Sequence, residues 1–82
     1  MTPQEQAKTD LAERLGVFVD EITLVSAEEV TWPDSSLGCP EPGMMYAQVL
    51  TSGSRIVLTA GGRTYEYHAG GQRAPFLCEN AR

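Results

Sequence analysis

The chain has 82 residues, of which 41% are apolar and 21% charged, with a formal net charge of −5. This length and composition are typical of one small globular domain, and we expect residues 1–82 to form a single unit. No apolar run approaches the roughly 18 residues that a membrane-spanning helix needs, so we expect no membrane insertion. The start of the chain also lacks the basic and apolar segments of a secretory signal.

The negative charge lies in the first third of the chain. Residues 1–30 contain seven acidic and two basic residues, whereas residues 31–82 contain four of each. Such a surface repels polyanions, and no basic stripe with interleaved aromatic residues is present. We therefore expect neither nucleic acid nor anionic lipid as a partner, and we expect the acidic residues to lie on solvated faces.

The first predicted element is an amphipathic helix over residues 3–15. Thr2 is a suitable N-cap, Pro3 suits the first helical position, and Glu5 can complete a capping box. The apolar stripe consists of Ala7, Leu11 and Leu15. Gly16 is expected to end the helix in the left-handed conformation.

A long strand is predicted from Ile22 to Trp32, with a bulge near Ser26 to Glu28 where the apolar alternation falters. The later strands are predicted over 44–51, 54–60, 63–68 and 74–78. Turns are expected at Ser52-Gly53, at Gly61-Gly62 and at 69–72. The Gly61-Gly62 pair is the strongest hairpin signal, because both central residues of a type I′ turn need positive φ.

These elements predict an α+β fold. With no second helix available for crossovers, neighbouring strands should pair antiparallel. We therefore expect one N-terminal helix packed on a four- or five-stranded antiparallel meander.

Residues 32–43 are predicted to form a rigid loop between the first two strands. The segment has three prolines and two glycines. Proline lacks the N–H that helix and sheet ladders need and restricts its own φ. A loop of this kind has little conformational freedom left to lose.

The chain has two cysteines, Cys39 in this loop and Cys78 near the C-terminus. They are too far apart for a C-x-x-C redox pair, and with His68 they leave a zinc site one ligand short. The spacing favours a structural disulfide in a secreted or extracytoplasmic protein, and free thiols in a cytoplasmic protein are the alternative. We expect no metal and no cofactor.

Catalysis by Ser35 or Ser36 with His68 and Asp34 is the only enzymatic arrangement that the residues suggest. A serine nucleophile needs its base within about 3 Å and an orienting group behind the base. Serine and aspartate beside a proline more often stabilise a turn, and no catalytic or nucleotide-binding motif occurs. We expect no enzyme activity, and we expect His68 to be a surface or strand-end residue.

Binding of a protein or peptide is the use that best suits a rigid loop with apolar side chains. The candidate contact residues are Trp32, Pro40, Glu41, Pro42, Met44, Met45 and Tyr46. A peptidase is one such partner, because the prolines resist cleavage and the methionines and tyrosine are typical interface anchors. In the competing interpretation, Met45 and Tyr46 begin a strand and Trp32 closes the core beneath the loop.

A set of sequence blocks gives this chain a family resemblance. They are Trp32-Pro33-Asp34-Ser35-Ser36-Leu37-Gly38-Cys39-Pro40, Pro42-Gly43-Met44, Gln48-Val49-Leu50-Thr51, Arg55-Ile56-Val57-Leu58, Tyr65-Glu66-Tyr67-His68 and Cys78. They resemble an uncharacterised family of small domains in secreted or lipid-anchored proteins of cyanobacteria and related bacteria. Where that pattern usually has a proline and a tyrosine, this chain has Ser52 and Ser54, so a looser first hairpin turn is expected. The resemblance implies a Cys39–Cys78 pair and an extracytoplasmic setting, and it implies no activity.

The predicted order of one helix and a meander also resembles, more weakly, cystatin-like and PepSY-type domains, some of which restrain peptidases. Fold alone does not determine function. The leading hypothesis is thus an extracytoplasmic protein-binding module, with peptidase inhibition as its narrower form. The alternative is a structural domain of a larger envelope protein with no activity of its own.

Overall fold

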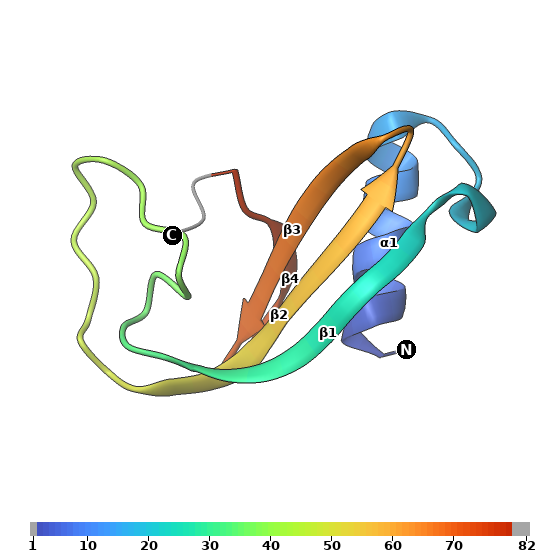
Figure 1. Cartoon of the computed structure of the whole chain (residues 1–82). Helices are drawn as coiled ribbons and strands as arrows, with labels where there is room; N and C mark the ends of the chain where they lie inside the picture. The colour runs from blue at the N-terminus through green and yellow to red at the C-terminus, as the bar shows by residue number, and fades with distance from the viewer. Residues whose placement is uncertain (1, 80–82) are drawn as a thin grey trace.

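The computed structural model describes residues 2–79, in which one helix packs on one face of a four-stranded antiparallel sheet (Figure 1). The elements are α1 (Pro3–Leu15), the 3-10 helix η1 (Val19–Glu21), β1 (Thr23–Trp32), β2 (Thr51–Ala60), β3 (Arg63–Gly70) and β4 (Arg73–Leu77). Each strand pairs with the next, in the order β1-β2-β3-β4. The α+β meander is confirmed, and the predicted domain ends at residues 1 and 82 lie outside the described part. No helix in the described part is long and apolar enough to cross a membrane.

Helix α1 begins and ends as its sequence predicts. The Thr2 hydroxyl accepts a hydrogen bond from the Glu5 N–H at 3.2 Å, which forms one half of the capping box. Gly16 follows the helix with φ of 68°, the left-handed conformation that glycine adopts without strain. The buried stripe consists of Ala7, Leu11 and Ala12, while Leu15, which the sequence places on the stripe, is exposed.

The main core lies between α1 and the sheet. Its buried members are Ala7, Leu11, Ala12, Ile22, Ile56, Leu58, Ala60 and Tyr67. The Tyr67 hydroxyl donates to the Asp10 carboxylate at 2.6 Å, and Arg14 forms an ion pair with the same carboxylate. Burial opposes ionisation of Asp10, but the hydrogen bonds from Tyr67 and Arg14 outweigh it and lower the pKa of Asp10. Burial and the bond to Asp10 raise the pKa of Tyr67.

The β2–β3 hairpin confirms the Gly61-Gly62 turn. Ala60 pairs with Arg63, and both glycines have positive φ, 59° and 79°. The bulge in β1 lies at Val25, just before the range predicted for it. Strand β3 continues through Gly70 instead of ending at His68, so the last turn is confined to 71–72.

The predicted strand over residues 44–51 is wrong, as is the turn at Ser52-Gly53. The structure describes all of residues 33–50 and assigns them to no strand. Gly53 lies inside β2 and pairs with Val30 on one side and Gly70 on the other. A Cβ at Gly53 would lie 2.0 Å from the Ala69 carbonyl oxygen and 2.6 Å from the Trp32 indole nitrogen. Glycine is therefore needed at position 53 because the Ala69 carbonyl and the Trp32 indole approach its backbone closely, and not because the chain turns there.

Candidate functional site

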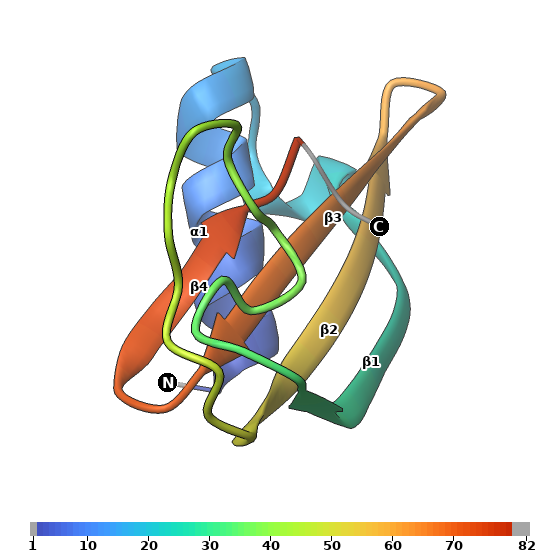
Figure 2. The same ribbon diagram turned by 90° about the vertical axis from the view of Figure 1, so that its left-hand side faces the viewer.

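The candidate site is the long connection between β1 and β2, residues 33–50. It extends beyond the strands on the side of the sheet away from α1 (Figure 1) and passes in front of β4 in the turned view (Figure 2). We call residues 33–40 the inner loop and residues 41–50 the outer loop. The two halves differ in burial and in what they can do.

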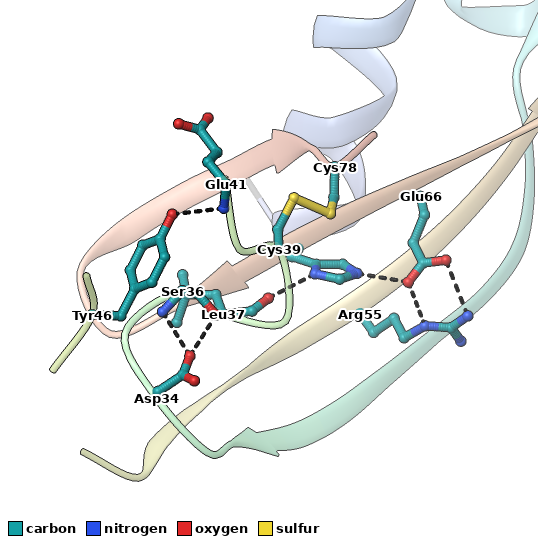
Figure 3. The surroundings of a disulfide bond; sticks show 10 residues. Asp34, Ser36, Leu37, Cys39, Glu41, Tyr46, Arg55, Glu66 and Cys78 are labelled. Carbon is teal, nitrogen blue, oxygen red and sulfur yellow. Dashed lines mark hydrogen bonds and ion pairs between the residues drawn. A yellow bond between two sulfur atoms is a disulfide. The ribbon is translucent and has the colours of Figure 1, made fainter. Parts of the chain in front are cut away.

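The inner loop is joined covalently to the end of the chain. Cys39 and Cys78 form a disulfide with an S–S distance of 2.11 Å and a Cα–Cα distance of 5.8 Å (Figure 3). The disulfide prediction is confirmed, and the free-thiol alternative is wrong. This bond closes a loop that contains the outer loop and strands β2, β3 and β4.

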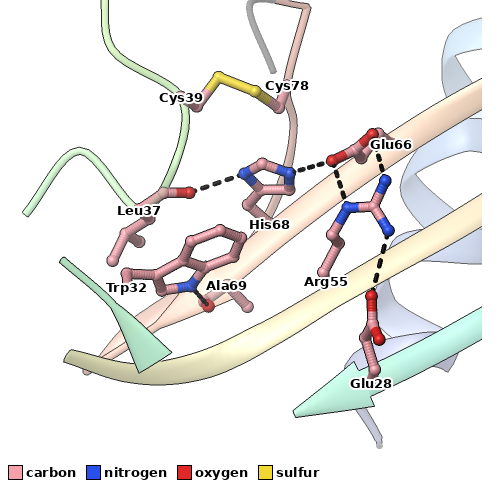
Figure 4. A network of polar contacts seen from close by, with 9 residues as sticks. All are labelled: Glu28, Trp32, Leu37, Cys39, Arg55, Glu66, His68, Ala69 and Cys78. Carbon is pink, nitrogen blue, oxygen red and sulfur yellow. Dashed lines mark hydrogen bonds and ion pairs between the residues drawn. A yellow bond between two sulfur atoms is a disulfide. The ribbon is translucent and has the colours of Figure 1, made fainter. Parts of the chain in front are cut away.

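His68 holds the inner loop from the sheet side. Its side chain faces away from α1, because its neighbour Tyr67 faces the helix and side chains alternate along a strand. Nδ1 lies 2.7 Å from the Leu37 carbonyl oxygen, and Nε2 lies 2.6 Å from the Glu66 carboxylate (Figure 4). One ring nitrogen thus contacts the loop backbone and the other contacts a carboxylate of the sheet. His68 is only 1% exposed, so its prediction as a surface residue is wrong.

A network of charged side chains on β1, β2 and β3 ends at His68. Arg55 on β2 contacts both oxygens of Glu66 on β3, at 2.7 and 3.1 Å, and reaches Glu28 on β1 at 3.1 Å. Burial raises the energy of the Glu66 carboxylate, but the hydrogen bonds from Arg55 and His68 outweigh this and lower the pKa of Glu66. The bond to Glu66 raises the pKa of Arg55. The network thus favours ionised Glu66 beside His68.

Trp32 closes a second, smaller core beneath the inner loop. Its indole stacks on His68 with ring centroids 4.5 Å apart, and its N–H donates to the Ala69 carbonyl at 2.9 Å. The buried residues on this side of the sheet include Trp32, Ser36, Leu37, His68 and Cys78. Trp32 is therefore buried beneath the loop, which is where the competing interpretation places it.

The serines of the inner loop support its fold. The Ser36 hydroxyl donates to the Asp34 carboxylate, and the Ser36 N–H donates to the same oxygen at 2.9 Å. The Ser35 hydroxyl accepts from the Ala47 N–H. Since both His68 nitrogens face Leu37 and Glu66, a serine–histidine–aspartate arrangement is not formed among the described residues.

The outer loop is braced at its base and across its turn. The Ser35 N–H donates to the Ala47 carbonyl at 2.9 Å, and the Ala47 N–H donates back to the Ser35 hydroxyl at 2.9 Å. The Tyr46 hydroxyl accepts from the Glu41 N–H at 2.9 Å (Figure 3), and the Met44 N–H donates to the Glu41 carbonyl. Tyr46 is partly buried as a result.

Large apolar side chains of the outer loop lie in solvent. The exposed fractions are 58% for Met44, 95% for Met45, 58% for Val49 and 76% for Leu50. Glu41 and Pro42 are also exposed, whereas Pro40 is half-buried. Val49 and Leu50 are not among the predicted contact residues, because they fall in the predicted strand over 44–51, although their apolar character is evident from the sequence.

A groove of about 490 Å³ lies between the outer loop, β4 and the end of α1. Met44 and Tyr46 form its loop side, and Phe76 lies on its β4 side. The Arg73 guanidinium lies over the Phe76 ring, 3.7 Å from its centroid. Met44 and Tyr46 thus face both solvent and a hollow of the domain, while Met45 does not line this groove.

Residues 4–78 match the family model described as Domain of unknown function (DUF8738). The chain belongs to the DUF8738 family. No curated protein and no solved structure matches the chain. The DUF8738 match contains nearly all of α1, all four strands and both cysteines, which agrees with a resemblance to an uncharacterised family of small domains.

The geometry assigns different physical roles to the two halves of the loop in this DUF8738 chain. The inner loop is a structural element, because Ser36 and Leu37 are buried and the Leu37 carbonyl is held by His68 of β3. The outer loop exposes apolar area on a braced backbone. Of the predicted contact residues, the structure brings Glu41, Pro42, Met44 and Met45 to the surface of one loop and leaves Trp32 beneath it.

Proposed function

We propose that this DUF8738 domain is an extracytoplasmic protein-binding module whose contact surface is the outer loop. The observation that carries this proposal is the exposure of Met45, Val49 and Leu50 on a backbone braced by Ser35 and by the Cys39–Cys78 disulfide. Exposed apolar side chains that cluster on one short segment are typical of interaction sites.

Bracing matters because a flexible loop loses conformational entropy when a partner captures it. Each rotamer-rich side chain and each mobile segment that becomes ordered reduces the affinity, so a loop held in shape before binding retains more of its contact energy. Methionine suits such a surface, because its unbranched thioether adapts to the partner. The outer loop carries one charge, that of Glu41, so its contacts are mainly apolar.

The extracytoplasmic location is supported by the disulfide. Such bonds persist in oxidising compartments and are rare in a reducing cytosol. The resemblance to domains of secreted or lipid-anchored bacterial proteins supports the same location. The cytoplasmic alternative would require Cys39 and Cys78 to be kept reduced.

Peptidase inhibition is the narrower form of this proposal. Inhibitors of this kind present a pre-shaped loop to the active-site cleft, with little backbone movement on binding. The test is to incubate the oxidised domain in micromolar excess with a panel of serine and cysteine peptidases and to measure residual activity. The proposal predicts inhibition of at least one peptidase, and inhibition of none would end this form of it.

A matched pair of variants shows whether inhibition comes from the outer loop. A Met45→Ser, Leu50→Ser double variant should lose inhibition, because it removes apolar side chains from the contact surface. Phe18→Ser is the control, because Phe18 is 81% exposed beside η1, outside the loop. Equal inhibition by both variants would contradict an outer-loop site.

A purely structural role in a larger envelope protein is the second candidate. The burial of Trp32, Ser36 and Leu37 favours it, because these residues stabilise the domain without reaching a partner. This role predicts that the panel stays fully active and that Met45→Ser changes nothing but the local surface.

A further inference from the structure

We infer that Met45 is the side chain that enters the apolar specificity pocket of a serine endopeptidase, with the Met45–Tyr46 peptide bond presented to the catalytic serine. This inference rests on the proposed function and names the partner class of the same loop. Met45 is 95% exposed, the highest value among the exposed large hydrophobic residues. It lies between the Glu41–Met44 turn and the anchor at Ala47.

The backbone at Met45 is free to pair with a partner. Within residues 2–79, neither its N–H nor its carbonyl has a hydrogen-bond partner in the domain. The N–H of Tyr46 is likewise without a partner in this described part. Extended peptides bind peptidase clefts and other sheet edges through such groups, with specificity supplied by pockets for alternate side chains.

The charge of the loop selects the class of pocket. Residues 42–50 carry no charge. A trypsin-like pocket contains an aspartate and demands a basic side chain, whereas a chymotrypsin-like pocket is an apolar slot. An uncharged thioether suits the apolar slot. Met44 is the poorer candidate, because it is less exposed and lines the groove beside β4.

The contacts around Met45–Tyr46 explain how such a loop would inhibit instead of being consumed. The catalytic serine oxygen would attack the Met45 carbonyl carbon and lose its proton to the peptidase's histidine. The bond to the Tyr46 nitrogen would then break, and the histidine would pass the proton to the Tyr46 amine. The result is an ester between Met45 and the enzyme, with Tyr46 as a new amino terminus. Inhibition requires that this amine stays in place and re-forms the peptide bond before water attacks the ester.

The domain holds that amine through three links across the broken bond. The Cys39–Cys78 disulfide joins the fragments 1–45 and 46–82 covalently. The Tyr46 hydroxyl accepts from the Glu41 N–H, and Ala47 exchanges two hydrogen bonds with Ser35. Glu41 and Ser35 both belong to the first fragment, so the new terminus remains beside the ester. Its high effective concentration favours resynthesis over release.

The decisive experiment replaces Met45, the side chain proposed to enter the specificity pocket, and asks whether the inhibited peptidase changes with it. Inhibition constants of the wild type, Met45→Arg and Met44→Arg are measured against chymotrypsin and trypsin. We expect Met45→Arg to lose chymotrypsin inhibition by about 100-fold and to gain trypsin inhibition. Met44→Arg, the matched control, should keep chymotrypsin inhibition within a few-fold and should not gain trypsin inhibition.

A second variant tests the links across the bond. Tyr46→Phe removes the hydroxyl that accepts from the Glu41 N–H and keeps the aromatic ring. We expect chymotrypsin to convert this variant faster into a form heavier by one water, with both fragments still joined by the disulfide. Mass spectrometry before and after reduction locates the cut. A main cut at any bond other than Met45–Tyr46 would overturn the assignment.

The outcomes separate this inference from the proposed function. If the wild type inhibits a peptidase but Met45→Arg and Met44→Arg act alike, the binding loop stands and the role of Met45 fails. Inhibition of cysteine peptidases alone would likewise overturn only the serine-peptidase assignment. If the wild type inhibits no peptidase in the panel, both the inference and the inhibitor form of the proposed function fail.

Discussion

His68 is the residue at which the loop and the sheet are joined. It is buried, its ring stacks on Trp32, and its two nitrogens face Leu37 and Glu66. The glycines that follow His68 in the sequence are typical of a turn and therefore predict a surface or strand-end residue. His68 is buried because the Trp32 indole covers this end of the sheet, where Gly53 leaves room for it.

Glu66 makes the stability of this junction depend on pH. Its pKa is lowered in the folded state, so its stabilisation is complete above the unfolded value near 4.5 and is lost as the pH falls through the lower folded value. We expect Glu66→Gln to cost about 1–3 kcal/mol at neutral pH, since it removes charged hydrogen bonds to Arg55 and His68. Urea unfolding between neutral and acidic pH measures both effects.

The matched control is Glu29→Gln, which changes an exposed acid on β1, two strands away from Glu66. It should leave the free energy of unfolding unchanged within about 0.5 kcal/mol. The difference between wild type and Glu66→Gln should shrink as the pH falls below 4.5. A difference that stays constant down to the acid transition would contradict the role given to the Glu66 carboxylate.

Helices and strands agree with the sequence predictions where neighbouring residues determine the conformation, and they differ where contacts distant in the sequence determine it. Helix α1 and the Gly61-Gly62 hairpin depend on caps and on positive φ, both readable from neighbouring residues. Residues 44–50 have strand-forming side chains, yet a strand also needs a neighbour to pair with. The structure offers them none, because Trp32 and Thr51 already pair at the end of β1 and β2.

The same distinction applies to the candidate site. The disulfide and the exposed Met44 and Met45 could be predicted, because the cysteine spacing and the proline content point to a shaped loop. The division into a buried and an exposed half could not, because it depends on Trp32 lying over Gly53 and Gly70. These three residues are distant in the sequence and meet only in the folded sheet.

Gly53→Ala tests whether the close approach of Trp32 and Ala69 to β2 stabilises this part of the fold. The added Cβ would meet the Ala69 carbonyl oxygen at 2.0 Å and the Trp32 nitrogen at 2.6 Å, and neither group can move without breaking the hydrogen bond between them. We expect a loss of about 2–3 kcal/mol in the free energy of unfolding. Ser52→Ala, at the neighbouring exposed position of β2, is the control. A Gly53→Ala loss no larger than that of Ser52→Ala would contradict the packing argument.

Residues 2–79 form two cores on opposite faces of one sheet. The larger core, between α1 and the sheet, contains neither cysteine. The smaller core, under the inner loop, includes Trp32, His68 and Cys78. Because β3 contributes Tyr67 to the larger core and His68 to the smaller one, the two cores are coupled through this strand.

Removing the disulfide should therefore weaken the smaller core first. Closing a loop of 39 residues corresponds to about 4 kcal/mol in the chain-entropy model. We expect a Cys39→Ser, Cys78→Ser double variant to lose stability of that order and to keep the far-UV circular dichroism of α1 and the sheet at low temperature. The proposed inhibition of a peptidase should weaken as well, because this variant lacks the covalent link between the fragments on either side of the Met45–Tyr46 bond.

Trp32 reports the state of the smaller core directly, because it is the only tryptophan in the chain. At 8% exposure, its emission in the oxidised protein should be blue and resistant to acrylamide. In the cysteine double variant we expect the emission to move to the red and quenching to rise several-fold while the circular dichroism persists. That result would mean that the covalent tie keeps the inner loop docked and so holds the outer loop in shape. If the emission stays blue and protected, Trp32 and His68 dock the loop unaided, and the disulfide has no part in bracing Met45.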